Sequence, residues 1–155
     1  MPSRLQSELK KKTAFASLEE ELYLNILRTG DRLQIHLDRL FRDHGLTPSQ
    51  YNILRILRSE GEALPILEIA SRTITAVPGI TGLIDRLEKA GFVERKRCLE
   101  DRRVIFVNIT AAGLKSLAQL DGPVQELQQQ LLSHLTRDEK KIAIRLLEQC
   151  RAERP

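Results

Sequence analysis

A chain of 155 residues can bury one hydrophobic core, but it leaves little room for two independent domains. Hydrophobic residues at 41% and charged residues at 30% are typical of a soluble globular protein, and an aromatic content of only 4% with abundant leucine favours a mostly helical fold. The net charge of +4 is too small to indicate a nucleic-acid partner by itself, and no apolar run approaches the roughly 20 residues of a transmembrane helix.

One long helical pattern dominates the N-terminal part of the chain. The first dozen residues have little apolar periodicity and are expected to form a frayed lead-in. From residue 18 onward, apolar side chains recur at steps of three, four and seven, which predicts a helix over residues 18–44 that Gly45 terminates. Its apolar stripe comprises Leu18, Leu22, Ile26, Leu33, Leu37, Leu40 and Phe41.

Two shorter helices are expected next. A Thr-Pro-Ser-Gln capping-box pattern at residues 47–50 begins the first of them, and Gly61 ends it. The apolar segment 64–70 predicts a further helix that is too short to be stable unless it packs on its neighbours. A polar turn over residues 72–75 follows.

Another helix and a β-hairpin complete the central part. Apolar residues at i, i+3, i+4 and i+7 predict a helix over residues 76–89, with Gly91 as its terminator. Two β-prone runs, residues 92–98 and 104–109, are separated by the charged segment 99–103. This arrangement predicts a β-hairpin with a charged tip.

The C-terminal part is again helical. Thr110 is expected to cap a helix that runs to about residue 132. The Gly-Pro pair at residues 122–123 should kink or break this helix, because proline cannot donate to the helical ladder. A second capping box at residues 136–139 begins a terminal helix with an apolar side.

The element order over residues 46–109, three helices followed by a hairpin, is that of a winged helix-turn-helix, whose third helix enters the major groove of DNA. We therefore expect a mainly α fold with a small β-hairpin wing. Residues 1–45 and 110–155 are expected to supply helices for dimerisation. The helix over residues 18–44 is longer than a small lobe can cover, so its remaining apolar face needs a partner.

Positive charge is concentrated around the expected hairpin, since residues 86–103 contain seven basic residues against four acidic ones. The preceding helix has small residues near its N-terminal end, which would let it approach base edges, although small faces also serve tight helix packing. Arginines at the hairpin tip suit a narrow minor groove, although such a charge run is more often only a solvated loop. The predicted DNA contacts are Pro78, Gly79, Thr81, Gly82, Arg86, Arg95, Arg97, Arg102 and Arg103.

Residues 101–113 resemble the D-x-R-x-x-x-V-x-[LI]-T-x-x-G signature of the MarR family of regulators. The matching residues are Asp101, Arg103, Val107, Ile109, Thr110 and Gly113. Residues 80–93 are similar to that family's recognition helix and first wing strand, and the flanking helices match in order and length. The small residues at positions 78, 79 and 82 depart from the Ser, Thr or Arg of many members, so the bases recognised cannot be carried over.

The resemblance implies a triangular homodimer that binds double-stranded DNA and regulates transcription, usually as a repressor. It also implies that Arg103 inserts into the minor groove and that Asp101 pairs with Arg86 to brace the wing. The intertwined terminal helices would form the dimer interface. Its expected residues are Leu18, Leu22, Ile26, Leu117, Leu120, Leu127, Leu131, Ile142 and Leu146.

Relatives of this kind bind small anionic aromatic effectors in the cleft between the dimerisation and DNA-binding parts, and His36 is a candidate to line that cleft. Cys98 lies among basic residues that would favour its thiolate, so oxidation could disturb the wing, although a passive strand cysteine is the simpler interpretation. No His or Cys spacing suggests a metal site or an activated nucleophile. We therefore expect no cofactor and no enzymatic activity.

The two cysteines are far apart in the sequence, and no secretory leader follows Met1, which predicts a cytoplasmic protein. A competing interpretation of the central lobe is a winged-helix module for protein interaction, with the basic hairpin merely solvated. Steep loss of DNA affinity with increasing salt would distinguish the DNA-binding protein from this module.

Overall fold

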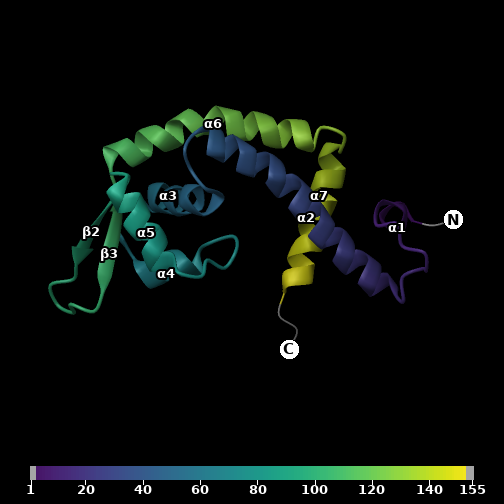
Figure 1. The fold of residues 1–155 in the computed structure, drawn as a ribbon, viewed down its shortest axis with the longest axis horizontal. Coiled ribbons are helices and arrows are strands. Elements are labelled where there is room, and N and C mark those ends of the chain that lie inside the picture. Colours follow the sequence, from purple (N-terminus) through teal and green to yellow (C-terminus); the bar gives the residue numbers. More distant parts are fainter. Residues whose placement is uncertain (1–2, 153–155) are drawn as a thin grey trace.

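The computed structural model describes residues 3–152, which form a winged lobe and a long helical arm (Figure 1). In chain order the elements are α1 (Arg4–Glu8), α2 (Leu18–Asp43), α3 (Pro48–Glu60), β1 (Leu64–Pro65), α4 (Ile66–Ser71), α5 (Ile80–Lys89), β2 (Val93–Arg97), β3 (Ile105–Ile109), α6 (Ala111–Leu131) and α7 (Arg137–Arg151). The mainly α fold with a small hairpin wing is therefore confirmed. No helix within residues 3–152 combines the length and the apolar character that crossing a membrane requires.

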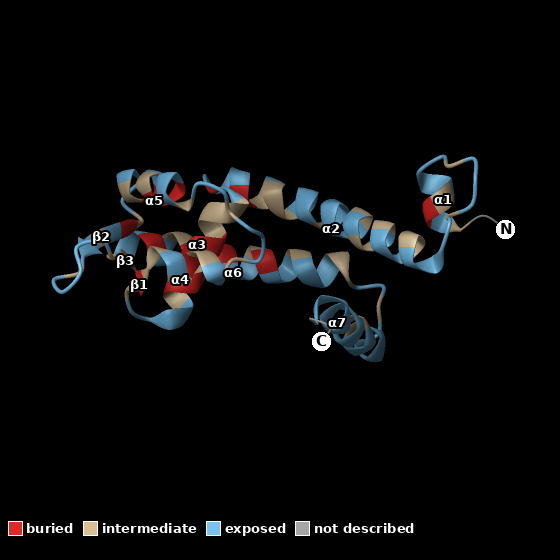
Figure 2. Ribbon diagram, turned by 90° about the horizontal axis from the view of Figure 1, so that it is seen from below, coloured by how far each residue is buried: buried red, intermediate tan, exposed pale blue. Residues whose placement is uncertain are grey.

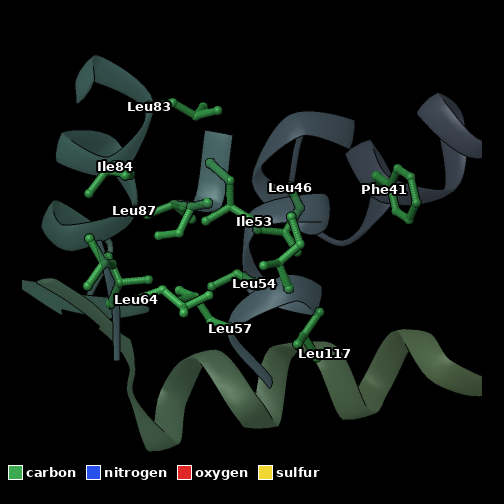
Figure 3. Close-up of a cluster of buried hydrophobic side chains, with 14 of the residues drawn as sticks. Phe41, Leu46, Ile53, Leu54, Leu57, Leu64, Leu83, Ile84, Leu87 and Leu117 are labelled. Carbon is green, nitrogen blue, oxygen red and sulfur yellow. The ribbon is translucent and has the colours of Figure 1, made fainter. Parts of the chain in front are cut away.

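The lobe consists of α3, α4 and α5 packed on a three-stranded antiparallel sheet with the order β1-β3-β2. Pairing of Val93 with Ile109 and of Arg97 with Ile105 fixes the register of the hairpin. The side chains of Ile53, Leu54 and Leu87 meet between the helices (Figure 3) and are fully buried. One continuous apolar core thus holds the helices against the sheet.

The predicted start and stop of α3 and the predicted start of α7 are confirmed. The side chain of Thr47 accepts a hydrogen bond from the amide of Gln50, and the Gln50 side chain accepts one from the amide of Thr47. Thr136 and Glu139 form the second capping box in the same way. Gly61 ends α3 in the left-handed conformation at φ +78°, which glycine adopts without strain.

Two predicted helix starts in the lobe were wrong. The segment 64–70 begins as a strand, because Leu64 and Pro65 pair with Val107 and Phe106 of β3, and only α4 is helical. The helix predicted over residues 76–89 starts later, since α5 begins at Ile80 after Gly79 at φ +71°. Pro78 and Gly79 therefore belong to the turn before α5 rather than to its exposed face.

The helices α2, α6 and α7 form the arm. The arm extends away from the lobe, and most of its surface is exposed to solvent (Figure 2). α6 extends from the lobe, and α7 turns away from its far end (Figure 1). The helix α6 continues through Pro123 as one helix, so the predicted alternative of a break is wrong. The buried side chains of Leu120 and Val124 hold the helix on the lobe on both sides of the proline, which offsets the missing hydrogen bond.

The N-terminal lead-in is more ordered than expected. Residues 4–8 form α1, whose first turn is capped by Ser3, and Leu5 is only 3% exposed. The guanidinium of Arg28 in α2 lies 3.8 Å from the carboxylate of Glu8, which ties α1 to the arm. Met1 and Pro2 lie outside the described residues.

The predicted dimerisation residues fall into two groups. Leu117 and Leu120 are 0% exposed because α6 packs them into the lobe of their own chain, so their assignment to a dimer interface is corrected. The others lie on the arm and remain partly or largely exposed. They are Leu18, Leu22, Ile26, Leu127, Leu131, Ile142 and Leu146.

Candidate nucleic-acid interface

The helix α5 presents one apolar and one open face. Leu83, Ile84 and Leu87 are buried against the lobe, whereas Thr81 and Arg86 are exposed on the other side. A Cβ atom at Gly82 would meet nothing within 4 Å, so this face has little bulk. Such a helix can approach the floor of a DNA groove closely.

The start of α5 is open to a ligand as well. Gly79 precedes the helix and offers no side-chain cap to the first amides of α5. Uncapped amides at a helix start carry partial positive charge and are potential donors to a phosphate oxygen. The turn residue Pro78 lies beside this helix start and is exposed.

The hairpin of β2 and β3 projects from the lobe as a wing (Figure 1). Its tip is closed by the amide of Cys98, which donates to the carbonyl of Val104 over 3.0 Å. Arg102 is exposed, and the side chain of Arg103 is 95% exposed. The wing thus carries two solvated guanidinium groups on a narrow loop, a form that fits a minor groove.

The predicted brace between Arg86 and Asp101 is not formed. Asp101 instead accepts the backbone amide of Arg103 over 3.0 Å and lies 3.5 Å from its guanidinium. Within residues 3–152, Arg86 has no ion-pair partner. Successive helical residues point about 100° apart, so Arg86 is directed away from the strand that its neighbour Asp85 faces.

A different ion cluster joins the wing to α5, and the sequence interpretation missed it. The guanidinium of Arg95 in β2 donates to Glu88 over 2.8 Å and also to Asp85. The backbone amide of Arg95 donates to Glu88 as well, over 3.1 Å. The hydrogen bond that Arg95 donates to Glu88 is the largest cause that raises the pKa of Arg95, and the negative charge of Asp85 raises this pKa further.

This cluster changes the assignment of Arg95. Its guanidinium is occupied by two carboxylates, so Arg95 is corrected from a predicted DNA contact to a link between β2 and α5. The signal was present in the sequence, because Asp85 and Glu88 are three residues apart and so share one face of a helix. Arg97, two residues further along β2, is exposed and remains a predicted contact.

A groove of about 510 Å³ opens where the arm meets the lobe. It is mainly apolar, with the rings of Phe41 and Tyr51 stacked at 4.3 Å. Arg55 is the one basic residue among the described residues that line it, and it donates to Asn52 over 2.9 Å. The lining residues are Gln34, Leu37, Asp38, Phe41, Pro48, Ser49, Tyr51, Asn52, Arg55, Ile74, Thr75, Val124 and Gln128.

His36 does not line this groove among the described residues, and its place in an effector cleft stays a prediction. The reason is helical periodicity, because Gln34, Leu37 and Asp38 face the groove and His36 lies on the exposed side of α2. Cys98 is partly exposed beside the wing tip. Its redox role stays a prediction.

Comparison with known proteins identifies the relatives of this chain. The model of the MarR family matches residues 46–105. A MarR transcription factor from Planctomyces limnophilus, known from its crystal structure, is 44% identical, with a TM-score of 0.68 over 86% of this chain and 98% of that one. The homoprotocatechuate degradative operon repressor of Escherichia coli is 24% identical over 132 residues, which cover 85% of this chain and 88% of the repressor.

The fold extends to more distant structures. An organohalide-sensing transcriptional regulator with 2,4-dichlorophenol bound has a TM-score of 0.80 at 18% identity, and the match covers 97% of this chain and 85% of that one. At this identity the likeness concerns the fold alone. The arrangement of lobe and arm is thus shared well beyond recognisable sequence similarity.

Proposed function

The chain belongs to the MarR family of DNA-binding transcriptional regulators, and from this premise we propose that it acts as a homodimeric, effector-responsive repressor. Two lobes would bind the half-sites of a pseudo-palindromic operator about one helical turn apart. Repression would follow from blocking the polymerase. Such a protein would act in the cytoplasm, where its operator is found.

The observation that carries this proposal is that α5 and the wing lie next to each other, since Thr81 and Arg103 line one hollow of the lobe. The open face of α5 with Thr81 and Arg86 suits the major groove, and the wing with Arg102 and Arg103 suits the adjacent minor groove. Asp85 and Glu88 would repel phosphates, and Arg95, which pairs with both, offsets one of their two negative charges. Residues 85–103 contain seven basic residues against five acidic ones, so net positive charge remains where DNA would lie.

Dimerisation is supported by the apolar surface of the arm. Leu18 is 80% exposed, Leu22 54%, Ile142 50% and Leu146 47%. Amphipathic helices of this length rarely leave such faces in water, and a second copy of the same chain is the commonest partner. We assign these residues, together with Ile26, Leu127 and Leu131, to the interface.

The groove between arm and lobe is the proposed effector site. Its stacked rings and apolar walls suit an aromatic ring, and Arg55 would hold an anionic substituent. The Escherichia coli relative is named as the repressor of an operon that degrades an aromatic acid. An effector would release DNA if it bound the splayed lobes about 5- to 150-fold better than the DNA-bound ones, a coupling of about 1–3 kcal/mol.

The test of DNA binding begins with selection of bound sequences from random duplex DNA. Affinity for the selected operator should fall by orders of magnitude between about 50 and 200 mM salt if several phosphates are contacted. Arg103→Ala should weaken binding without a change in fold or oligomeric state, whereas Arg32→Ala, at an exposed position of α2, should bind as the parent does. Equal binding by the Arg103→Ala variant would refute the assignment of the wing, and absence of duplex binding by the parent would favour the protein-interaction module.

The effector site is tested separately. Phenolic acids such as dihydroxyphenylacetate, added to the protein–operator complex, should release DNA in a concentration-dependent way. Arg55→Gln should shift this response to higher concentrations while leaving operator affinity without effector unchanged. If the parent and the variant respond equally, Arg55 does not hold the effector.

A further inference from the structure

A second hollow, of about 490 Å³, lies between α4, α5 and the tip end of the wing. Its walls are mostly apolar. Of the described residues that line it, only Arg103 is charged and only Thr81 carries a hydroxyl group. The complete lining is Pro65, Ile66, Leu67, Thr81, Arg103, Val104 and Ile105.

One wall of this hollow is formed by Leu67, a large apolar side chain that is exposed to solvent. It lies in the first turn of α4 and is 83% exposed, whereas its neighbour Ile66 packs against the lobe core. A single exposed leucine needs no explanation by itself. Here, however, Leu67 shares the hollow with the hydroxyl group of Thr81 on α5 and the guanidinium of Arg103 on the wing, so the hollow offers contacts for both the sugar and the phosphate of a nucleic-acid strand.

The position of the hollow follows from the proposed function, on which this inference rests. If α5 lies in the major groove and the wing tip lies in the adjacent minor groove, one DNA strand must pass between them, because a single sugar-phosphate backbone separates neighbouring grooves. The hollow occupies the space between α5 and the wing. Any strand that passes there crosses Leu67.

We propose that this hollow binds the DNA strand that crosses between α5 and the wing. Leu67 and the side of Val104 contact the face of a deoxyribose, while the hydroxyl of Thr81 donates to the adjacent phosphate. Arg103 approaches the same strand from the wing and supplies the charge complementarity, with Asp101 at 3.5 Å holding the guanidinium near the hollow until phosphate replaces it. The apolar contact depends on neither base sequence nor salt, whereas the contact between arginine and phosphate weakens as the salt concentration rises.

The test compares two exposed apolar residues. Leu67→Ser is expected to lower affinity about 5- to 20-fold, the loss that removal of part of a buried leucine contact produces. The loss should be equal for the selected operator and for unrelated duplex DNA, and the slope of log affinity against log salt should not change. Ile35→Ser is the control, because Ile35 on α2 is 46% exposed and lines neither this hollow nor the groove between arm and lobe, so this variant should bind DNA as the parent does.

Two further variants separate the polar contacts. Thr81→Val keeps the shape but removes the donor, and it should lower affinity about 10-fold, as expected for loss of a hydrogen bond to a charged group. Arg103→Ala should reduce the salt slope by about 1, which Leu67→Ser should not. Thermal unfolding and light scattering establish that each variant keeps the fold and the oligomeric state of the parent.

The outcomes are distinct. If the parent binds DNA well and the Leu67→Ser variant binds it with the same affinity, the assignment of this hollow to the crossing strand is overturned and the proposed function is left intact. A loss confined to the selected operator would also overturn this assignment, because Leu67 would then distinguish bases. A parent without affinity for any duplex would overturn the proposed function itself.

Discussion

The Nε of Arg95 donates to a carboxylate oxygen of Glu88 over 2.8 Å, and this hydrogen bond joins the first strand of the wing to the helix α5. Because Asp85 binds the same guanidinium, two side chains of α5 hold the first strand of the wing. The relative position of the two elements decides whether the major and minor grooves can be occupied together. The cluster therefore matters for DNA binding without touching DNA.

Arg95→Gln should lower affinity for the operator several-fold and leave the salt slope unchanged, because the guanidinium is already paired with carboxylates and releases no DNA counterion. The side chains of the cluster are about one-third exposed or more, so stability should fall by less than about 1 kcal/mol. Arg97→Gln is the matched comparison on the same strand, and it should reduce the salt slope by about 1. A reduced slope for Arg95→Gln, measured by titration at several salt concentrations, would show that Arg95 contacts phosphate.

Gly113 in α6 and Gly82 in α5 both lie within helices but should respond oppositely to alanine. A Cβ atom at Gly113 would collide with the carbonyl oxygen of Phe92 and lie 2.8 Å from Cγ1 of Ile109, so Gly113→Ala should destabilise the chain by about 1–3 kcal/mol. At Gly82 a Cβ atom would meet nothing within 4 Å, and Gly82→Ala should stabilise the helix by about 1 kcal/mol. Urea unfolding of both variants measures the difference, and effects of the same sign would contradict this account.

Arg58 and Asp121 join α3 to α6 through two hydrogen bonds of 2.9 and 2.8 Å. The hydrogen bond from Arg58 is the main cause that lowers the pKa of Asp121 below its ordinary 3.8. Ionised Asp121 thus stabilises the folded state fully above pH 3.8, and the contribution disappears as the pH falls through the lower pKa of the folded state. Asp121 is half exposed, which limits the effect to about 1 kcal/mol or less.

The Asp121→Asn variant isolates this pair. Its free energy of unfolding should be lower than that of the parent at neutral pH, and the gap should close progressively at acidic pH below 3.8. Denaturant unfolding at a series of pH values provides the measurement. A gap that stays constant into strong acid would mean that the carboxyl charge of Asp121 contributes nothing.

Leu117 and Leu146 distinguish the lobe core from the proposed dimer interface. Leu117→Ala leaves a cavity in a fully buried site and should cost about 2–5 kcal/mol of stability. Leu146→Glu places a charge on an apolar face that is 47% exposed in one chain, so it should dissociate the dimer while the lobe stays folded. Light scattering and circular dichroism check both results, with Gln149→Glu, an exposed position on the same helix, as the neutral control. A monodisperse dimer of Leu146→Glu would exclude this face from the interface.

Local patterns in the sequence were enough to predict most elements. The capping boxes that begin at Thr47 and Thr136 and the left-handed glycine Gly61 depend on neighbours three or four residues away, and the structure confirms them. The hairpin and the mostly helical fold were predicted for the same reason. Family resemblance added the function, because the signature from Asp101 to Gly113 is defined by spacing alone.

Side-chain partners from different elements could not be predicted in this way. The order of residues alone determined which segments are helical, where they are capped and which lobe carries the basic wing. The tertiary structure alone decided that Arg95 pairs with Glu88 and Asp85, that Leu117 belongs to the core and that His36 lies outside the groove. Caps and helical periodicity arise from contacts within a few residues of the chain, whereas these choices depend on how far each helix is rotated and shifted against its neighbours, and packing of the whole core sets that geometry.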